Sequence, residues 1–257
     1  MSPLEAVAIG LAGLAAGTIN TVVGSGTLIT FPTLLAFGVP PVTANVSNTI
    51  GLVPGSVSGV VGYRRELEGQ GARSVRIGLA SLVGGLVGAV LLLVLPKEAF
   101  SAIVPALVGL GILPVIVQPR ISRWVAARHD AAGAAPRNPV TGAWWVRPGV
   151  LVAGVYGGYF GAAQGVLLMG ILGVGIPEDL QRLNALKNVL AAIVNAVAGL
   201  LFIVVAHVDW QIVGLIALGS VIGGQLGATV GRRLPSPVLR AVIVVVGVVA
   251  LTVFLVG

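Results

Sequence analysis

Two triplets of polar residues have the spacing of a ligand-binding helix face. Within each triplet the residues follow one another at i, i+3 and i+4, so their side chains project from the same side of a helix. The first triplet is Asn45, Asn48 and Thr49, and the second is Asn184, Lys187 and Asn188. Amide, hydroxyl and ammonium groups donate hydrogen bonds. These residues therefore predict the binding of a small anion without covalent chemistry.

A second group of polar residues lies at two glycine-rich breaks. The charge-free stretch 17–49 is interrupted at Gly24 and Gly26, and the stretch 148–177 is interrupted by GAAQG at 161–165. A helix that starts after such a break has its unpaired N–H groups and positive dipole end there, where an anion can bind. We expect the site to include Asn20, Ser25, Gly26, Thr27, Gln164 and Gly165. The alternative is that the serine and threonine hydroxyls only bind local backbone carbonyls.

The composition indicates an all-α integral membrane protein. Of the 257 residues, 56% are hydrophobic and 9% are charged, whereas an average soluble domain has about 25% charged residues. At membrane depth, irregular backbone is tolerated only where it is buried in protein or lines a cavity. The two breaks therefore point to a binding site. We expect no metal and no cofactor, because the chain has no cysteine and its two histidines, His129 and His207, are far apart.

The chain is organised as two repeats joined by a basic linker. With a constant offset of 139, Asn45 falls on Asn184, and GGLVGA at 84–89 falls on GGQLGA at 223–228. Each repeat is predicted to be an interrupted helical hairpin followed by three transmembrane helices. The predicted domains are a first repeat (1–118), a cytoplasmic linker (119–147) and a second repeat (148–257). The helices after the hairpins are expected near 43–63, 77–96, 99–118, 180–206, 210–231 and 237–256.

The basic residues predict the orientation of these repeats. Twelve arginines fall in three loops, whereas Lys97 is on the opposite side. The positive-inside rule makes the three loops cytoplasmic and both termini periplasmic, and it explains the net charge of +7 without nucleic-acid binding. The helix at 43–63 then runs inward and its repeat at 180–206 runs outward, so the repeats have inverted topology. Each interrupted segment is either a re-entrant hairpin or two full crossings.

Two pairs of glycines at small-xxx-small spacing let helices approach closely. They are Gly84 with Gly88 and Gly223 with Gly227. We expect them to pack helices inside the chain, and a homodimer contact is the alternative.

The sequence resembles the TauE/SafE permeases. The resemblance rests on a glycine-broken first segment with Pro32 and Leu34 downstream, then ANVSNT at 44–49, and a repeat of this arrangement after a basic central loop. It covers nearly the whole chain. Two departures are GSGT and GQGV in place of a denser glycine cluster, and Ile171 where the second half would repeat Pro32. The resemblance implies movement of sulfite, sulfonates or related small oxyanions across a bacterial inner membrane.

Our interpretation is a secondary transporter of a small anion that works by alternating access. An anion channel, or a carrier of another oxyanion or a carboxylate, is the alternative. An intramembrane serine protease is excluded, because Ser25 has no histidine nearby to act as a base, and the protein is not expected to be an enzyme. The expected partners are the anion and the lipid bilayer, while a coupling proton or sodium ion and a homodimer stay open.

Lys187 is expected to be the principal cationic contact of the substrate, or a partner that compensates its charge. It would lie about 10 Å from the membrane edge, and an ionisable residue at such a depth is a functional hypothesis by default. Two alternatives remain. The side chain could extend to the cytoplasmic surface, or it could pair with Asp179 or Glu178.

Overall fold

The computed structural model describes residues 1–131, 140–230 and 245. Within these ranges the regular structure is helical and contains no β-strand, which confirms the all-α class. The helices are α1 (Pro3–Val22), α2 (Thr27–Ala36), α3 (Pro41–Gly62), α4 (Gly71–Val94), α5 (Lys97–Ala131), α6 (Val146–Tyr159), α7 (Gln164–Gly175), α8 (Leu180–Val205) and α9 (Trp210–Thr229). Among the described helices, α1, α4, α8 and α9 are long and apolar enough to cross a membrane. The chain is therefore an integral membrane protein.

The helix boundaries agree with the sequence-based expectation to within about two residues except in α4 and α5. Helix α4 starts at Gly71 and not near residue 77, so part of the expected charged loop is helical. Helix α5 continues to Ala131 instead of ending near residue 118, so the first part of the predicted linker is helical. Residues 120–131 include three alanines and three arginines, and both residue types are strong helix formers. The helix expected near 237–256 lies outside the described residues.

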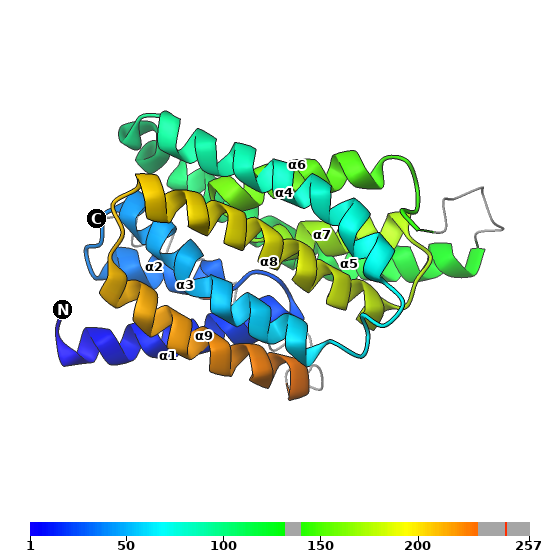
Figure 1. The fold of residues 1–257 in the computed structure, drawn as a ribbon, viewed down its shortest axis with the longest axis horizontal. Helices are drawn as coiled ribbons and strands as arrows, with labels where there is room; N and C mark the ends of the chain where they lie inside the picture. Colours follow the sequence, from blue (N-terminus) through cyan, green and yellow to red (C-terminus); the bar gives the residue numbers. More distant parts are fainter. Residues whose placement is uncertain (132–139, 231–244, 246–257) are drawn as a thin grey trace.

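The two interrupted segments form short hairpins. Helices α2, α6 and α7 have 10, 14 and 12 residues, which gives them lengths of about 15 to 21 Å. A hydrocarbon core is about 30 Å thick, so these helices are too short to cross it. In Figure 1, α2 runs back along α1 towards the end of the bundle from which α1 started. Helix α1 is long enough to cross, so the first interrupted segment joins one long limb to one short limb, whereas both limbs of the second, α6 and α7, are short.

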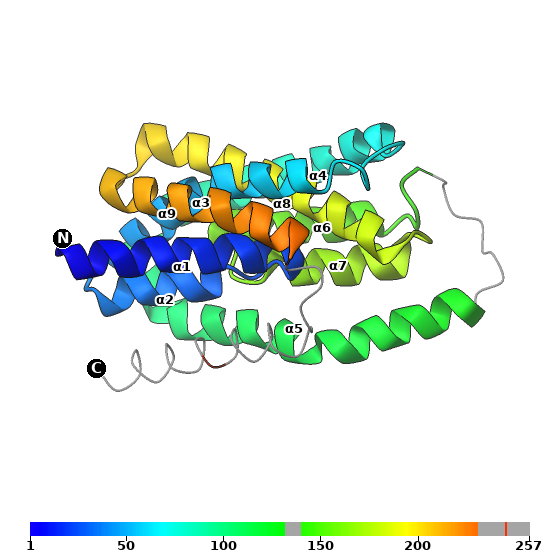
Figure 2. The same cartoon turned by 90° about the horizontal axis from the view of Figure 1, so that it is seen from below.

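The long helices pack side by side in a repeated pattern. As Figure 2 shows, helix α9 packs against α1 and α3, and α4 packs against α6 and α8. Figure 1 also shows that α3 and α8 run in opposite directions, as do α4 and α9. The turns α2–α3 and α8–α9 lie with the N-terminus at one end of the bundle, here called the N-terminal end. The turns α3–α4 and α7–α8 lie at the other end, here called the linker end.

Glycine allows the closest of these helix contacts. A methyl group at Gly84 or Gly88 would collide with backbone oxygens of α6, and one at Gly223 or Gly227 would collide with backbone oxygens of α1. Both glycine pairs therefore pack helices inside the chain, as the sequence predicted.

Local sequence determines where the long helices start. Ser2 and Glu5 form a capping box at the start of α1. Asp179 and Asp209 accept hydrogen bonds from the first turns of α8 and α9. The capped N-terminal ends of α8 and α9 lie at opposite ends of the bundle. The start of α8 sets the depth of the polar residues that this helix carries.

Candidate functional site

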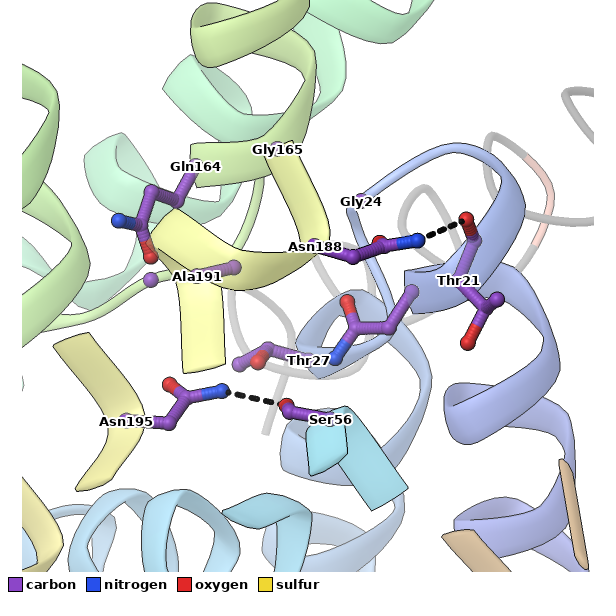
Figure 3. Close-up of a pocket in the computed structure, with 11 residues that line it drawn as sticks. Thr21, Gly24, Thr27, Ser56, Gln164, Gly165, Asn188, Ala191 and Asn195 are labelled. Carbon is purple, nitrogen blue, oxygen red and sulfur yellow. Dashed lines mark hydrogen bonds between the residues drawn. The ribbon is translucent and has the colours of Figure 1, made fainter. Parts of the chain in front are cut away.

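The two helix breaks meet inside the bundle. The Gly165 N–H donates a hydrogen bond of 3.0 Å to the Gly24 carbonyl oxygen. A methyl group on either glycine would collide with the α-carbon of the other. Gly24 also has φ of 93°, a left-handed conformation that favours glycine. The tips of the two hairpins are therefore in backbone contact (Figure 3).

The second polar triplet binds the C-terminal end of α1. The Lys187 ammonium donates to the Asn20 and Thr21 carbonyl oxygens at 2.9 and 3.2 Å. The side-chain amides of Asn184 and Asn188 donate to the Thr21 carbonyl oxygen at 3.2 and 3.3 Å. The last carbonyls of a helix have no partner within it and form its negative dipole end. The triplet therefore caps α1, and the Lys187 side chain, which is fully buried, does not extend to the surface or pair with Asp179 or Glu178.

In the first polar triplet, Asn45 bonds to the other hairpin, whereas Asn48 bonds to α2 and Thr49 to its own helix. Asn45 donates to the carbonyl oxygen of Tyr159, the last residue of α6, at 2.9 Å. Asn48 does not reach α6, because its side chain accepts from Thr30 and donates to Thr27 on α2. The Thr49 hydroxyl donates to the Asn45 carbonyl oxygen one turn earlier, a local backbone bond that threonine commonly makes in helices.

A small cavity lies between the hairpin tips. Its volume is about 20 Å³, which is room for roughly one water molecule. The lining residues come from α1, α2, α3, α8 and the two breaks (Figure 3). They are Asn20, Thr21, Gly24, Thr27, Ser56, Gly161, Gln164, Gly165, Asn188, Ala191 and Asn195.

The predicted site residues fall into two groups around this cavity. One group lines it: Asn20, Thr27, Gln164, Gly165 and Asn188. The other group is buried but does not line it: Ser25, Gly26, Asn45, Asn48, Thr49, Asn184 and Lys187. Asn20 connects the groups, because its side-chain oxygen accepts from the Gly26 N–H at 2.7 Å at the start of α2.

Six polar or small lining residues were not among the predicted site residues: Thr21, Gly24, Ser56, Gly161, Ala191 and Asn195. The Asn195 amide donates to the Ser56 hydroxyl at 3.1 Å, and the two positions differ by 139. That number is the offset of the repeat, so the pair could have been found by searching for equivalent polar residues. Ala191 has no comparable sequence signal.

Several buried polar atoms at the breaks have no hydrogen-bond partner in the described part of the protein. They are Ser25 Oγ, Gln164 Nε2, Asn45 Oδ1 and Asn184 Oδ1. Most buried polar groups in proteins are paired, and an unpaired one is costly. Of these four atoms, Gln164 Nε2 is the one whose residue lines the cavity, where it can donate a hydrogen bond to a ligand. No group of three histidine, cysteine or acidic residues in the described ranges could hold a metal ion.

The two ends of the bundle differ near this site. At the linker end, Glu178 pairs with Arg73 at 2.8 Å and with Arg182 at 3.1 Å, which joins α4 to the α7–α8 turn. Burial raises the pKa of the Glu178 carboxyl, but hydrogen bonds from Arg73 and the Asp179 backbone, with the charges of Arg182 and Arg73, outweigh burial and lower this pKa below 4.5.

At the N-terminal end, an open groove of about 430 Å³ lies between the α2–α3 and α8–α9 turns. It is lined by Phe37, Gly38, Val39, Pro40, Thr43, His207, Val208, Asp209, Trp210 and Gln211. The offset of 139 relates Val39 to Glu178 and Thr43 to Arg182. Residues separated by this offset thus lie at the ion-paired end and at the open end.

Comparison with known proteins identifies the family. Residues 9–254 match the family "Sulfite exporter TauE/SafE". The chain is 25% identical over 254 residues to "Probable membrane transporter protein YfcA" of Escherichia coli strain K12, covering 97% of this chain and 89% of that protein. It is 24% identical over 242 residues to "Probable membrane transporter protein ORF9" of a Sinorhizobium species, with 93% and 87% coverage. No solved structure matches. The protein therefore belongs to the sulfite exporter TauE/SafE family, whose members are multi-pass membrane transporters and not enzymes.

Proposed function

We propose that this protein is a secondary transporter that moves a small anion, sulfite or an organosulfonate, by alternating access. The observation that carries this proposal is the contact between the two hairpin tips around a buried polar cavity. Discontinuous helices that meet at the midplane are typical of the substrate sites of secondary transporters.

The charge distribution at the breaks favours an anion. Helices α2 and α7 begin at Thr27 and Gln164, which both line the cavity, so two positive dipole ends lie beside it. No acidic residue lines the cavity. Lys187 adds a buried positive charge one helix turn from the lining residue Ala191. We propose that this charge compensates the substrate while its ammonium group holds the end of α1.

The cavity is too small to hold the proposed substrate in this state. A volume of about 20 Å³ is too small for an anion of several heavy atoms, since one water needs roughly 10 to 15 Å³ on this measure. A bound substrate therefore requires the hairpins to move apart. The ion pairs at the linker end and the open groove at the N-terminal end are consistent with a state that is closed towards one side.

Alternating access would arise from two inverted repeats. The proposed domains are 1–118 and 148–257, with 119–147 as the linker. The helix packing supports this division, because the offset of 139 relates the pair α1–α9 to α6–α4 and the pair α3–α9 to α8–α4. We further propose that the protein lies in the bacterial inner membrane with its linker end in the cytoplasm and its termini in the periplasm.

Orientation can be tested by labelling single cysteines, because the natural chain has none. Ser2→Cys and Arg65→Cys are both exposed positions, at the N-terminal and linker ends. A membrane-impermeant thiol reagent added to intact cells should label the first and not the second. Labelling of Arg65→Cys alone would reverse the proposed orientation.

Counterflow in proteoliposomes tests the function. Vesicles loaded with unlabelled sulfite or an organosulfonate should transiently accumulate the labelled compound from outside, because a carrier exchanges one substrate for another. Passive equilibration without this overshoot would indicate a channel. No flux of either compound, together with flux of a carboxylate, would assign a different substrate class.

A further inference from the structure

The broken helices α1 and α6 end at equivalent positions, but only one end is bound to a fixed cation. At α1, the Lys187 ammonium and two amides donate to the last carbonyls. The ion pairs in the described ranges involve Glu178 and not Lys187. The positive charge of Lys187 is therefore compensated by the negative dipole end of α1 and not by a carboxylate.

The end of α6 has no such charge. The offset of 139 places Asn45 at the position of Asn184, and Asn48 at that of Lys187. Asn45 donates to the Tyr159 carbonyl oxygen at 2.9 Å, as Asn184 does to α1. Asn48 is neutral, and its side chain binds two threonines of α2. The negative end of α6 thus receives one neutral amide from this face of α3.

An unpaired acceptor lies beside this helix end. Asn45 is 1% exposed, and its side-chain oxygen has no hydrogen-bond partner. The amide cannot be turned over to pair this oxygen, because its nitrogen must face the Tyr159 carbonyl oxygen. The side-chain oxygen of Asn184 at the end of α1 is also unpaired, but there the Lys187 ammonium already supplies a positive charge. The amide of Asn45 presents its bare oxygen at a helix end that has no such charge. Neutral oxygens of this kind are ligands for hard cations, and the ends of half-helices coordinate such ions in transporters.

We infer that a sodium ion binds at the C-terminal end of α6, with Asn45 Oδ1 and the Tyr159 carbonyl oxygen among its ligands. There the sodium ion compensates the negative dipole end of α6, as the Lys187 ammonium does at the end of α1. A proton is not an equivalent occupant, because amide and carbonyl oxygens do not take up a proton near neutral pH. The inference rests on the proposed transport function, in which this sodium ion would be the coupling ion.

Sodium binding to the purified protein in detergent tests the site without any anion or transport. We expect NaCl to raise the thermal unfolding temperature saturably relative to choline chloride at equal ionic strength, and radioactive sodium to bind. Asn45→Ala should weaken sodium binding at least tenfold. Asn184→Ala is the matched control, because it removes the equivalent amide at the end that Lys187 occupies, and it should bind sodium like the wild type.

Two further variants keep the inference testable if Asn45→Ala does not fold. Asn45→Asp should bind sodium more tightly than the wild type and depend on it for stability, because a carboxylate beside the Tyr159 carbonyl needs a cation between them. Asn48→Lys places an ammonium at the position equivalent to Lys187 and should abolish sodium binding. The inference is overturned if choline and sodium stabilise the wild type equally, or if Asn45→Ala and Asn184→Ala bind sodium alike. Either result would leave anion transport itself untouched.

Discussion

At the scale of single residues, Lys187 and the two tip glycines explain how a broken backbone is stable inside a membrane protein. The carbonyls that the break leaves without helical partners are bound by Lys187 and its two asparagine neighbours. The tips themselves need Gly24 and Gly165, because no side chain fits between them. Polar and small residues thus have a structural role at the same positions where the sequence suggests a function.

Replacing Lys187 removes both the charge and the cap of α1. Lys187→Gln should abolish anion uptake into proteoliposomes while the protein still purifies as a folded species, because Asn184 and Asn188 keep their bonds to the Thr21 carbonyl oxygen. Lys187→Arg should not restore uptake, since a planar guanidinium differs from a compact ammonium in shape and hydration. Wild-type uptake by the Gln variant would contradict a role for this charge in transport.

Adding one methyl group at a hairpin tip should separate the two breaks. Gly165→Ala would place its Cβ against the Gly24 backbone, and overpacking of this kind costs about 1 to 3 kcal/mol. We expect a lower thermal unfolding temperature and lost transport. Gly214→Ala is the control, because it lies in helix α9 with open space around it, and alanine there should be neutral or stabilising by up to about 1 kcal/mol. Equal behaviour of the two variants would mean that the tip contact is unimportant.

At the scale of elements, polar contacts hold the second hairpin against the long helices. Glu178, Arg73 and Arg182 tie the α7–α8 turn to the start of α4. The buried side chain of Gln70 adds a bond to the Arg182 carbonyl oxygen at 3.0 Å. These contacts join segments from the two halves of the chain at the linker end.

Removing the Glu178 carboxylate should weaken this connection in a pH-dependent way. The folded-state pKa is lowered by the arginines, so the carboxylate stabilises the fold fully above its unfolded pKa and loses this effect as the pH falls through the lowered value. Glu178→Gln should cost about 1 kcal/mol above pH of about 6, given that partly exposed ion pairs contribute about 0.2 to 1 kcal/mol each. The difference from the wild type should shrink as the pH falls below 4.5.

Thermal unfolding across this pH range provides the measurement. Glu68→Gln is the matched control, because this exposed carboxylate in the α3–α4 turn has no ion pair among the described residues. It should have little effect at any pH. A Glu178→Gln difference that stays constant between pH 7 and pH 4 would show that the ion pairs do not stabilise the fold.

The sequence predicted the elements better than their contacts. Proline, glycine and charge placed the ends of α3, α8 and α9 within two residues, because these signals are local. The composition of residues 120–131 did not distinguish a linker from a helical extension of α5. The i, i+3, i+4 spacing placed each triplet on one helix face. It did not predict what that face binds. The bonds to the ends of α1 and α6 arise only when the hairpins pack, so no local pattern predicts them.

At the scale of the whole molecule, the hairpin tips bring residues from both halves to one point. Asn195 and Ser56, which the repeat offset relates, bond to each other beside the cavity. One end of the bundle is joined by ion pairs and the other is a groove. Under the proposed inverted repeats, this difference between the ends is what a carrier needs in order to open to each side in turn.

The central claim is that the two breaks form one anion site, and the affinity for sulfite across matched variants tests it most directly. Thr27→Ala and Gln164→Ala each change a cavity-lining side chain from a different half. Thr33→Ala is the control, because its hydroxyl bonds only the Ile29 carbonyl oxygen on α2 and does not line the cavity. In calorimetric titration of the purified protein, both lining variants should weaken binding by about 0.5 to 1.5 kcal/mol, the contribution of one neutral hydrogen bond, and Thr33→Ala should not. Unchanged affinity in both lining variants would contradict the account and place the anion elsewhere.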